Sequence, residues 1–189
     1  MSLADAGGKG AVKSATVMVQ WEAAQRILAS NNSKDYGILS VILQLFAKCV
    51  VHFQVPPTVF DPHPTVNSAL IGLRFLPPEQ LNKRLEGISP FQLRRVLACV
   101  FQQRRKMMRK SLKKLLIPLC DGDIDATNKI LNSKPLPLTD YACQARSVGD
   151  VVAAKQELPT NWAVLRPEQL SPGQLLEVSR LINCHTPIK

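Results

Sequence analysis

The stretch from Ser89 to Leu116 reads SPFQLRRVLACVFQQRRKMMRKSLKKLL. Ser89 is a favourable N-cap residue and Pro90 suits the first helical turn, where a missing N–H costs nothing, so we expect a helix to begin here. Apolar residues then recur every three or four positions as far as Leu116, which predicts one continuous helix with a single buried stripe. The stripe is broken once, at Arg104.

The other face of this predicted helix is strongly basic. It carries nine cations with no acidic residue among them, namely Arg94, Arg95, Arg104, Arg105, Lys106, Arg109, Lys110, Lys113 and Lys114. Residues 76–117 hold eleven basic and two acidic side chains, a net charge of +9 against +10 for the whole chain. Because like charges on one face repel unless an anion lies against them, the pattern indicates a nucleic-acid or ribosomal surface. The alternative is a solvated face that serves solubility alone.

The composition is that of a globular intracellular protein. The chain has 189 residues, 46% of them hydrophobic, which suffices for one domain or a small pair. No apolar run approaches the ~18 residues of a membrane helix. Aromatic residues make up only 5% of the chain, which argues against insertion into an acidic membrane surface.

Neither the cysteines nor the acidic residues predict a metal site. The five cysteines form no CxxC motif and are odd in number, so we expect them to be reduced and mostly buried. The three histidines stand apart from other ligands, which argues against zinc. Asp121, Asp123 and Asp125 copy the start of an EF-hand loop, but Ala126 and Asn132 replace its glycine and its last glutamate, so no calcium site is expected.

Upstream of the basic stretch, short apolar runs alternate with polar breaks. The pattern predicts strands at 15–20, 50–55 and 68–75 and helices at 21–29 and 36–48. Pro62 and Pro64 exclude regular structure from 58–67.

Pro77 and Pro78 mark a boundary in the predicted elements. After it we expect a short helix at 79–85, the basic helix ending at Pro118, a loop at 132–158 and a last helix from Ser171 to about Asn183. The predicted organisation is a flexible lead (1–14), an α/β portion (15–77) and a helical domain (78–189).

Five segments together resemble the KsgA-type rRNA adenine dimethyltransferases, a family that includes the dimethyladenosine transferases, the mitochondrial transcription factor B proteins and, more distantly, the Erm methylases. The matching segments, in the order of the family pattern, are VMVQWEAAQRILA (17–29), KDYGILSVILQ (34–44), FDPHPTVNSAL (60–70), FQQRRKMMRKSL (101–112) and LRPEQLSP (165–172). Departures from the pattern are Trp21 and Thr65, where the family usually has Lys, and Met107, where it usually has Thr. We expect these departures to weaken charge contacts near the target loop.

The resemblance implies the C-terminal part of such an enzyme, beginning at about the fifth strand of a Rossmann-like methyltransferase sheet and ending in a small all-α domain. Family members begin with a Gly-rich turn that approaches S-adenosylmethionine. The GGKG at residues 7–10 has neither a strand before it nor a helix start after it, which makes it a poor cofactor loop. S-adenosylmethionine is therefore expected to bind only if a partner supplies the N-terminal half.

The resemblance also implies a role for Phe60. In the family the Phe of this proline-rich loop stacks on the target adenine, and Pro62 and Pro64 would stiffen the loop. The alternative is that Phe60 is a core residue beneath a turn. The nine cations of residues 94–114 are expected to contact phosphates of small-subunit ribosomal RNA.

Two functions follow from this resemblance. The chain is either the RNA-binding part of an rRNA adenine N6,N6-dimethyltransferase, inactive in methyl transfer without a separate half, or a catalytically silent component or assembly factor of the small ribosomal subunit. A transcription factor B-like role ranks below both. Because residues 15–20 would lack their neighbouring strand, we expect a second protein chain, a ribosomal protein or RNA to cover that edge. The expected location is intracellular, in the mitochondrion or alternatively the cytoplasm or nucleolus.

Overall fold

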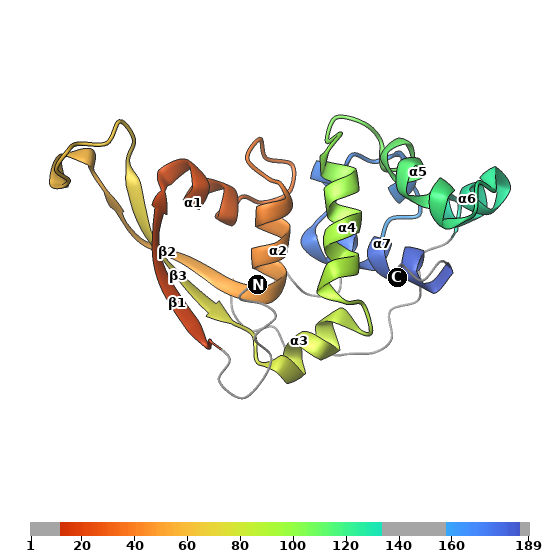
Figure 1. Ribbon diagram of the computed structural model, residues 1–189, viewed down its shortest axis with the longest axis horizontal. Coiled ribbons are helices and arrows are strands. Elements are labelled where there is room, and N and C mark those ends of the chain that lie inside the picture. The colour runs from red at the N-terminus through yellow and green to blue at the C-terminus, as the bar shows by residue number, and fades with distance from the viewer. Residues whose placement is uncertain (1–11, 134–157, 186–189) are drawn as a thin grey trace. The chain divides into compact units, whose positions relative to one another are not determined.

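The computed structural model describes residues 12–133 and 158–185, which form two compact units (Figure 1). One, called here the sheet unit, contains the chain up to Ser30 and residues Lys34–Arg84. The other, called the helical unit, contains Asn31–Ser33 and the chain from Leu85 onward. The predicted loop 132–158 lies mostly outside the described residues, as does the GGKG segment.

The sheet unit is a three-stranded antiparallel sheet with two helices on one face (Figure 1). Its elements are β1 (Ser14–Gln20), α1 (Trp21–Leu28), α2 (Ile38–Phe46), β2 (Ala47–Val55), β3 (Ser68–Phe75) and α3 (Pro78–Leu85), the last reaching the boundary between the units. The strand order is β1-β3-β2, so β3 is central and β1 is an edge strand among the described residues. These elements match the predicted ones to within about two residues at most ends.

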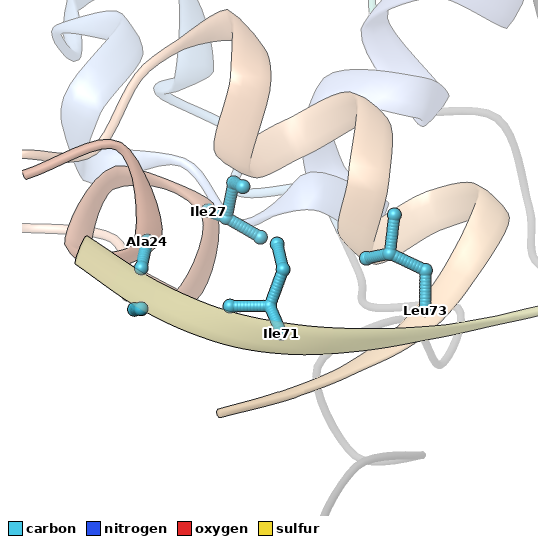
Figure 2. Close-up of a cluster of buried hydrophobic side chains, with 5 residues drawn as sticks. Ala24, Ile27, Ile71 and Leu73 are labelled. Atoms are coloured by element: carbon cyan, nitrogen blue, oxygen red, sulfur yellow. The ribbon is translucent and has the colours of Figure 1, made fainter. Parts of the chain in front are cut away.

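The core of the sheet unit lies between β3 and α1. Ala69, Ile71 and Leu73 alternate along β3 and are buried on one face, as the period-2 geometry of a strand requires. Figure 2 shows Ala24 and Ile27 of α1 directed at this face.

Polar side chains join α1 to α2. The amide of Gln44 donates hydrogen bonds to the carbonyls of Ile27 and Ala29, both at 3.0 Å, which satisfies acceptors that the end of α1 leaves open. Ser40 accepts from the N–H of Gly37 and donates to the carbonyl of Arg26. The segment 34–44, one of the five that resemble the family pattern, therefore fixes these two helices to each other.

The opposite face of the sheet is exposed to solvent and carries three large apolar side chains among polar ones. Met18, Val50 and Phe53 are 53%, 53% and 57% exposed. The register pairs both Met18 and Phe53 with Leu70, so Met18, Leu70 and Phe53 form one row across the sheet. The neighbouring row contains Gly72, where an added Cβ would lie 2.6 Å from Nε2 of His52.

The helical unit contains α4 (Pro90–Phe101), α5 (Met108–Leu119), α6 (Ile124–Leu131) and α7 (Pro172–His185), with single 3-10 turns at Trp162–Val164 and Pro167–Gln169. Among its described residues it has no strand. The predicted cap is confirmed, because Ser89 Oγ accepts from the N–H of Gln92 at 3.2 Å and Gln92 Oε1 accepts from the N–H of Ser89 at 2.9 Å.

The prediction of one continuous helix over 89–116 is wrong. The chain turns at residues 102–107, so the nine cations are distributed over α4, this turn and α5. A continuous helix would have placed Arg104 in the buried stripe, where a charge is costly without a partner. Pro118 was expected to end the helix, yet it lies inside α5, which ends at Leu119.

Candidate nucleic-acid interface

The nine predicted cations all belong to the helical unit. Six of their side chains are exposed, namely Arg94, Arg105, Lys106, Arg109, Lys110 and Lys114, and the other three are half-buried. On α5, Met108, Leu112 and Leu116 are fully buried. At 100° per residue Lys110 and Lys114 lie on the opposite side of the helix, so α5 is packed on one face and cationic on the other.

The N-terminal end of α5 is unusually positive. Met107 occupies the N-cap position and makes no side-chain cap, and the first turn contains no acidic residue. Arg109 and Lys110 lie in that turn instead. The N-terminus of a helix carries a partial positive charge of about half a unit, which favours anions and disfavours cations. An anion such as phosphate would relieve this unfavourable arrangement.

Arg104 has a structural contact that the sequence did not indicate. Its Nε and Nη2 donate to the same oxygen of Glu168, Oε2, at 3.1 and 2.9 Å. Backbone hydrogen bonds also join residues 165–168 to other parts of the helical unit. The N–H of Met108 donates to the carbonyl of Leu165 at 2.8 Å, and the N–H of Asn32 donates to the carbonyl of Glu168 at 2.7 Å. Arg104 therefore holds the turn between α4 and α5 against residues 165–168.

Phe91 is a second feature that the sequence analysis left aside. It lies in the first turn of α4 with 60% of its surface exposed. The guanidinium carbon of Arg95 lies over the ring, 5.9 Å from its centroid. In the sequence Phe91 stands outside the apolar stripe, which begins at Leu93, and nothing there marks it as a contact residue.

The Phe60 loop lies at one end of the sheet unit. It joins the carboxyl end of β2 to the start of β3, and the N–H of Trp21 donates to the carbonyl of Asn67 at 2.9 Å. This bond and the Gln20–Ser68 pairing bring the segments 17–29 and 60–70 together. Phe60 itself is half-buried, and its carbonyl contacts the ring of His63.

The described cysteines are free, and none is fully buried. Cys49, Cys99 and Cys120 are half-buried and Cys184 is exposed, so the expectation of mostly buried thiols is wrong for these four. Burial raises the pKa of Cys49 to about 11. Burial also raises the pKa of Cys99, although Lys114 and a backbone hydrogen bond act in the opposite direction. Both shifts keep these thiols protonated and poorly nucleophilic near neutral pH.

The part of the chain that the structure describes shows neither a metal cluster nor a membrane helix. No cluster of three or more histidine, cysteine or acidic side chains there could hold a metal ion. Nor is any helix within residues 12–133 and 158–185 long and apolar enough to cross a bilayer.

The fold is similar to part of the fold of a dimethyladenosine transferase. The chain superposes on the crystal structure of a dimethyladenosine transferase from Plasmodium falciparum with a TM-score of 0.60, covering 90% of this chain and 58% of that one at 21% sequence identity. The protein belongs to the Ribosomal RNA adenine dimethylase family, whose sequence profile matches residues 7–139.

Bacterial relatives agree with this assignment. The chain is 44% identical over 106 residues to the Ribosomal RNA small subunit methyltransferase A of Salinibacter ruber, covering 56% of this chain and 34% of the relative. It is 36% identical over 135 residues to the protein of the same name from Mannheimia succiniciproducens, covering 70% and 44%. The chain thus spans less than half the length of these curated relatives.

Proposed function

We propose that this chain binds small-subunit ribosomal RNA through the helical unit and carries the RNA-binding and target-adenine part of an rRNA adenine N6,N6-dimethyltransferase. The observation that carries the proposal is the cationic row, by which we mean the nine cations that follow one another along α4, the turn and α5. Six of them are exposed, and no acidic residue lies between Arg94 and Lys114. Such a surface binds phosphates, which give affinity and orientation without reading sequence.

The start of α5 supports phosphate binding in particular. A protein that used this surface only for solubility would gain stability from an acidic residue in the first turn, because the helix dipole favours negative charge there. Arg109 and Lys110 occupy the first turn instead, so α5 lacks that stabilisation. Their presence is understandable if an RNA phosphate supplies the negative charge in the complex.

Phe60 is our candidate for stacking on the target adenine. The Phe60 loop lies at the end of the sheet where β1 and β2 both end, and the Gln20–Ser68 pairing brings the start of α1 to the same end. The half-buried ring has an exposed proline and an exposed aspartate directly after it. The competing role, a packing residue of the loop, predicts that Phe60→Leu lowers stability and methyl transfer together, whereas stacking predicts loss of methyl transfer alone.

Methyl transfer is proposed to need a part that binds S-adenosylmethionine outside the residues of this chain, either in a longer form of the same polypeptide or in a second chain. The alignments cover only 34% and 44% of two bacterial relatives, which supports this proposal. The sheet offers two features such a part could contact, namely the edge strand β1 and the exposed face with Met18, Val50 and Phe53. An exposed strand edge readily accepts another strand.

The alternative function is a catalytically silent component or assembly factor of the small ribosomal subunit. It uses the same cationic surface but no stacked adenine and no methyl donor. The two functions therefore differ only in what happens after RNA is bound.

The experiment measures methyl transfer to small-subunit ribosomal RNA by the purified chain, with and without the S-adenosylmethionine-binding half of a family member. The proposal expects RNA binding in both cases and methylation only with the added half. RNA binding that never leads to methylation supports the silent alternative, and turnover by the chain alone contradicts the need for another part. Absence of RNA binding in dilute salt contradicts both functions.

A matched pair of variants compares charge reversal inside the cationic row with the same charge reversal elsewhere on the chain. A double variant of two exposed cations, Arg109→Glu with Lys114→Glu, should lose most of the RNA affinity. The same change of charge at Lys83→Glu with Lys129→Glu, exposed residues of α3 and α6, should leave RNA affinity within about twofold, since they lie outside the cationic row.

A further inference from the structure

We infer that Phe91 and Arg95 form a stacking site for one unpaired nucleotide of the bound RNA. This inference rests on the proposed RNA binding and adds a contact of a different kind, directed at a base rather than at phosphate. The phenyl ring is 60% exposed, and the guanidinium of Arg95 lies over it at 5.9 Å from the centroid. This distance is at the outer limit of a cation–π contact.

The ring cannot turn into the core of the helical unit. The buried residues of α4 are Leu93, Val96, Leu97 and Val100. At 100° per residue, Phe91 lies on the side away from them, where Arg94, Arg95, Ala98 and Gln102 follow it along the helix. Arg94, Ala98 and Gln102 are exposed, so the ring begins an outward row that leads to the cationic turn at 102–107.

Two sets of hydrogen bonds fix the helical turn that contains Phe91. Ser89 and Gln92 cap the helix reciprocally, and Nε2 of Gln92 donates to Oδ1 of Asn183 on α7 at 2.9 Å. The residue next to Phe91 is therefore tied to another helix. A ring presented from a fixed turn loses little conformational entropy when a base stacks on it.

The chemistry of this pair fits an unpaired base. Aromatic side chains and arginine both stack on bases, and stacking accepts any base because each has a π-face. In a duplex the base faces are already stacked, so such a site selects single-stranded or looped RNA. The exposed Arg94 on the same face can meet a phosphate beside the stacked base.

A single exposed phenylalanine is common on protein surfaces. The feature that distinguishes Phe91 is its combination with an arginine over the ring, an exposed arginine beside it and a cationic row in continuation. A protein partner is the competing occupant, and it predicts no role for Phe91 in RNA binding.

The test uses the full chain and two RNA probes, a single-stranded 12-mer with one 2-aminopurine and the same sequence as a duplex. Phe91→Leu should weaken single-strand binding about tenfold, in line with one lost stacking contact, and abolish the quenching of 2-aminopurine. Duplex affinity and the salt dependence of binding should not change. Phe91→Trp should restore both single-strand affinity and quenching, and thermal unfolding should show that each variant is folded.

The outcomes separate this inference from the proposed function. If the wild-type chain binds both RNAs and Phe91→Leu binds them equally well, the stacking site is wrong while the phosphate surface stands. Equal weakening on single strand and duplex also contradicts stacking. If the wild-type chain binds neither probe in dilute salt, both the proposed function and this inference fail.

Discussion

Arg104 lies in the turn where the chain leaves α4 and enters α5. In the sequence it is only the one charge in an apolar stripe. In the structure its guanidinium binds Glu168, and the polypeptide turns there instead of continuing as a helix. The sequence shows that Arg104 interrupts the apolar stripe, but it does not show the turn that follows. The reason is that Glu168, the partner of Arg104, lies 64 residues further along the chain.

The Arg104–Glu168 pair is expected to contribute modestly to stability. The side chains are 39% and 23% exposed, so solvent screens the pair. We predict a coupling free energy of about 0.5–1 kcal/mol in a double-mutant cycle of Arg104→Ala and Glu168→Ala, measured by urea unfolding. Because Glu168 faces Arg104 and not RNA in this account, Glu168→Ala should not reduce the number of phosphate contacts. A coupling energy of zero would mean that the turn is held by its backbone bonds alone.

The thiols give a prediction about reactivity. With a pKa of about 11, Cys49 is only about 0.1% thiolate at pH 8 and about 10% at pH 10. Iodoacetamide should therefore label the exposed Cys184 well before Cys49 at pH 8, and labelling of Cys49 should accelerate as the pH rises, as followed by peptide mass spectrometry. A Cys184→Ser variant serves as the control for peptide assignment. Labelling of Cys49 and Cys184 at equal rates at pH 8 would contradict the burial of Cys49.

At the scale of elements, local sequence signals predicted most helices and strands. The β-branched run at 15–20 is β1, and the Ser-Pro pairs at 89–90 and 171–172 begin α4 and α7. In α7, Ser171 and Gln174 repeat the reciprocal cap seen at α4, with bonds of 3.0 and 3.2 Å. These signals act within one turn of helix or one strand, which is why the sequence alone reveals them.

The order of the strands could not be predicted in the same way. β3 lies between β1 and β2 because its buried residues pack on α1, a contact between residues more than 40 positions apart. Of the candidate site, the cations were predicted and their division over two helices was not. Phe91 was missed because an isolated phenylalanine outside an apolar stripe has no distinctive pattern in the sequence.

A substitution at the start of α5 should change stability and RNA affinity in opposite directions. Arg109→Glu should raise the free energy of unfolding by about 0.3–1 kcal/mol, because it replaces a cation with an anion near the positive end of the helix. The same variant should weaken RNA binding, since it removes a phosphate contact and adds repulsion. Thermal unfolding and RNA titration check the two signs. Arg109→Gln, which removes the charge without reversing it, should give a smaller change of the same sign in both measurements.

A variant that lost both stability and RNA affinity would instead indicate that Arg109 supports the fold. A variant that gained stability without losing RNA affinity would place the phosphate contacts elsewhere.

At the scale of the whole molecule, the cationic row and the apolar row of the sheet lie on different units. The cationic row belongs to the helical unit, and the exposed apolar row of Met18, Leu70 and Phe53 belongs to the sheet unit. In the proposed function, RNA is the partner of the first surface and a second part or chain is the partner of the other. This division agrees with a chain that aligns with less than half the length of its curated relatives.

The edge of the sheet gives a prediction for hydrogen exchange. The N–H of Phe75 bonds to the carbonyl of Lys13, and in an antiparallel ladder alternate residues face the neighbouring strand, so the amides of Thr16 and Met18 point away from β3. We expect these amides to exchange quickly in the isolated chain, and those of Val17 and Val19 slowly. Adding the S-adenosylmethionine-binding half of a family member should protect Thr16 and Met18. Protection of Thr16 and Met18 in the isolated monomer would show that the edge is already covered.

The proposed function requires that exposed cations of the helical unit bind ribosomal RNA phosphates, and the salt dependence of RNA binding measures this contact. If the six exposed cations each neutralise one phosphate, the logarithm of the association constant should fall with the logarithm of salt concentration at a slope of about −4. Arg109→Gln with Lys114→Gln should make that slope shallower, and Lys83→Gln with Lys129→Gln should not. Affinity that did not change with salt, or a slope equally steep in both double variants, would contradict the account.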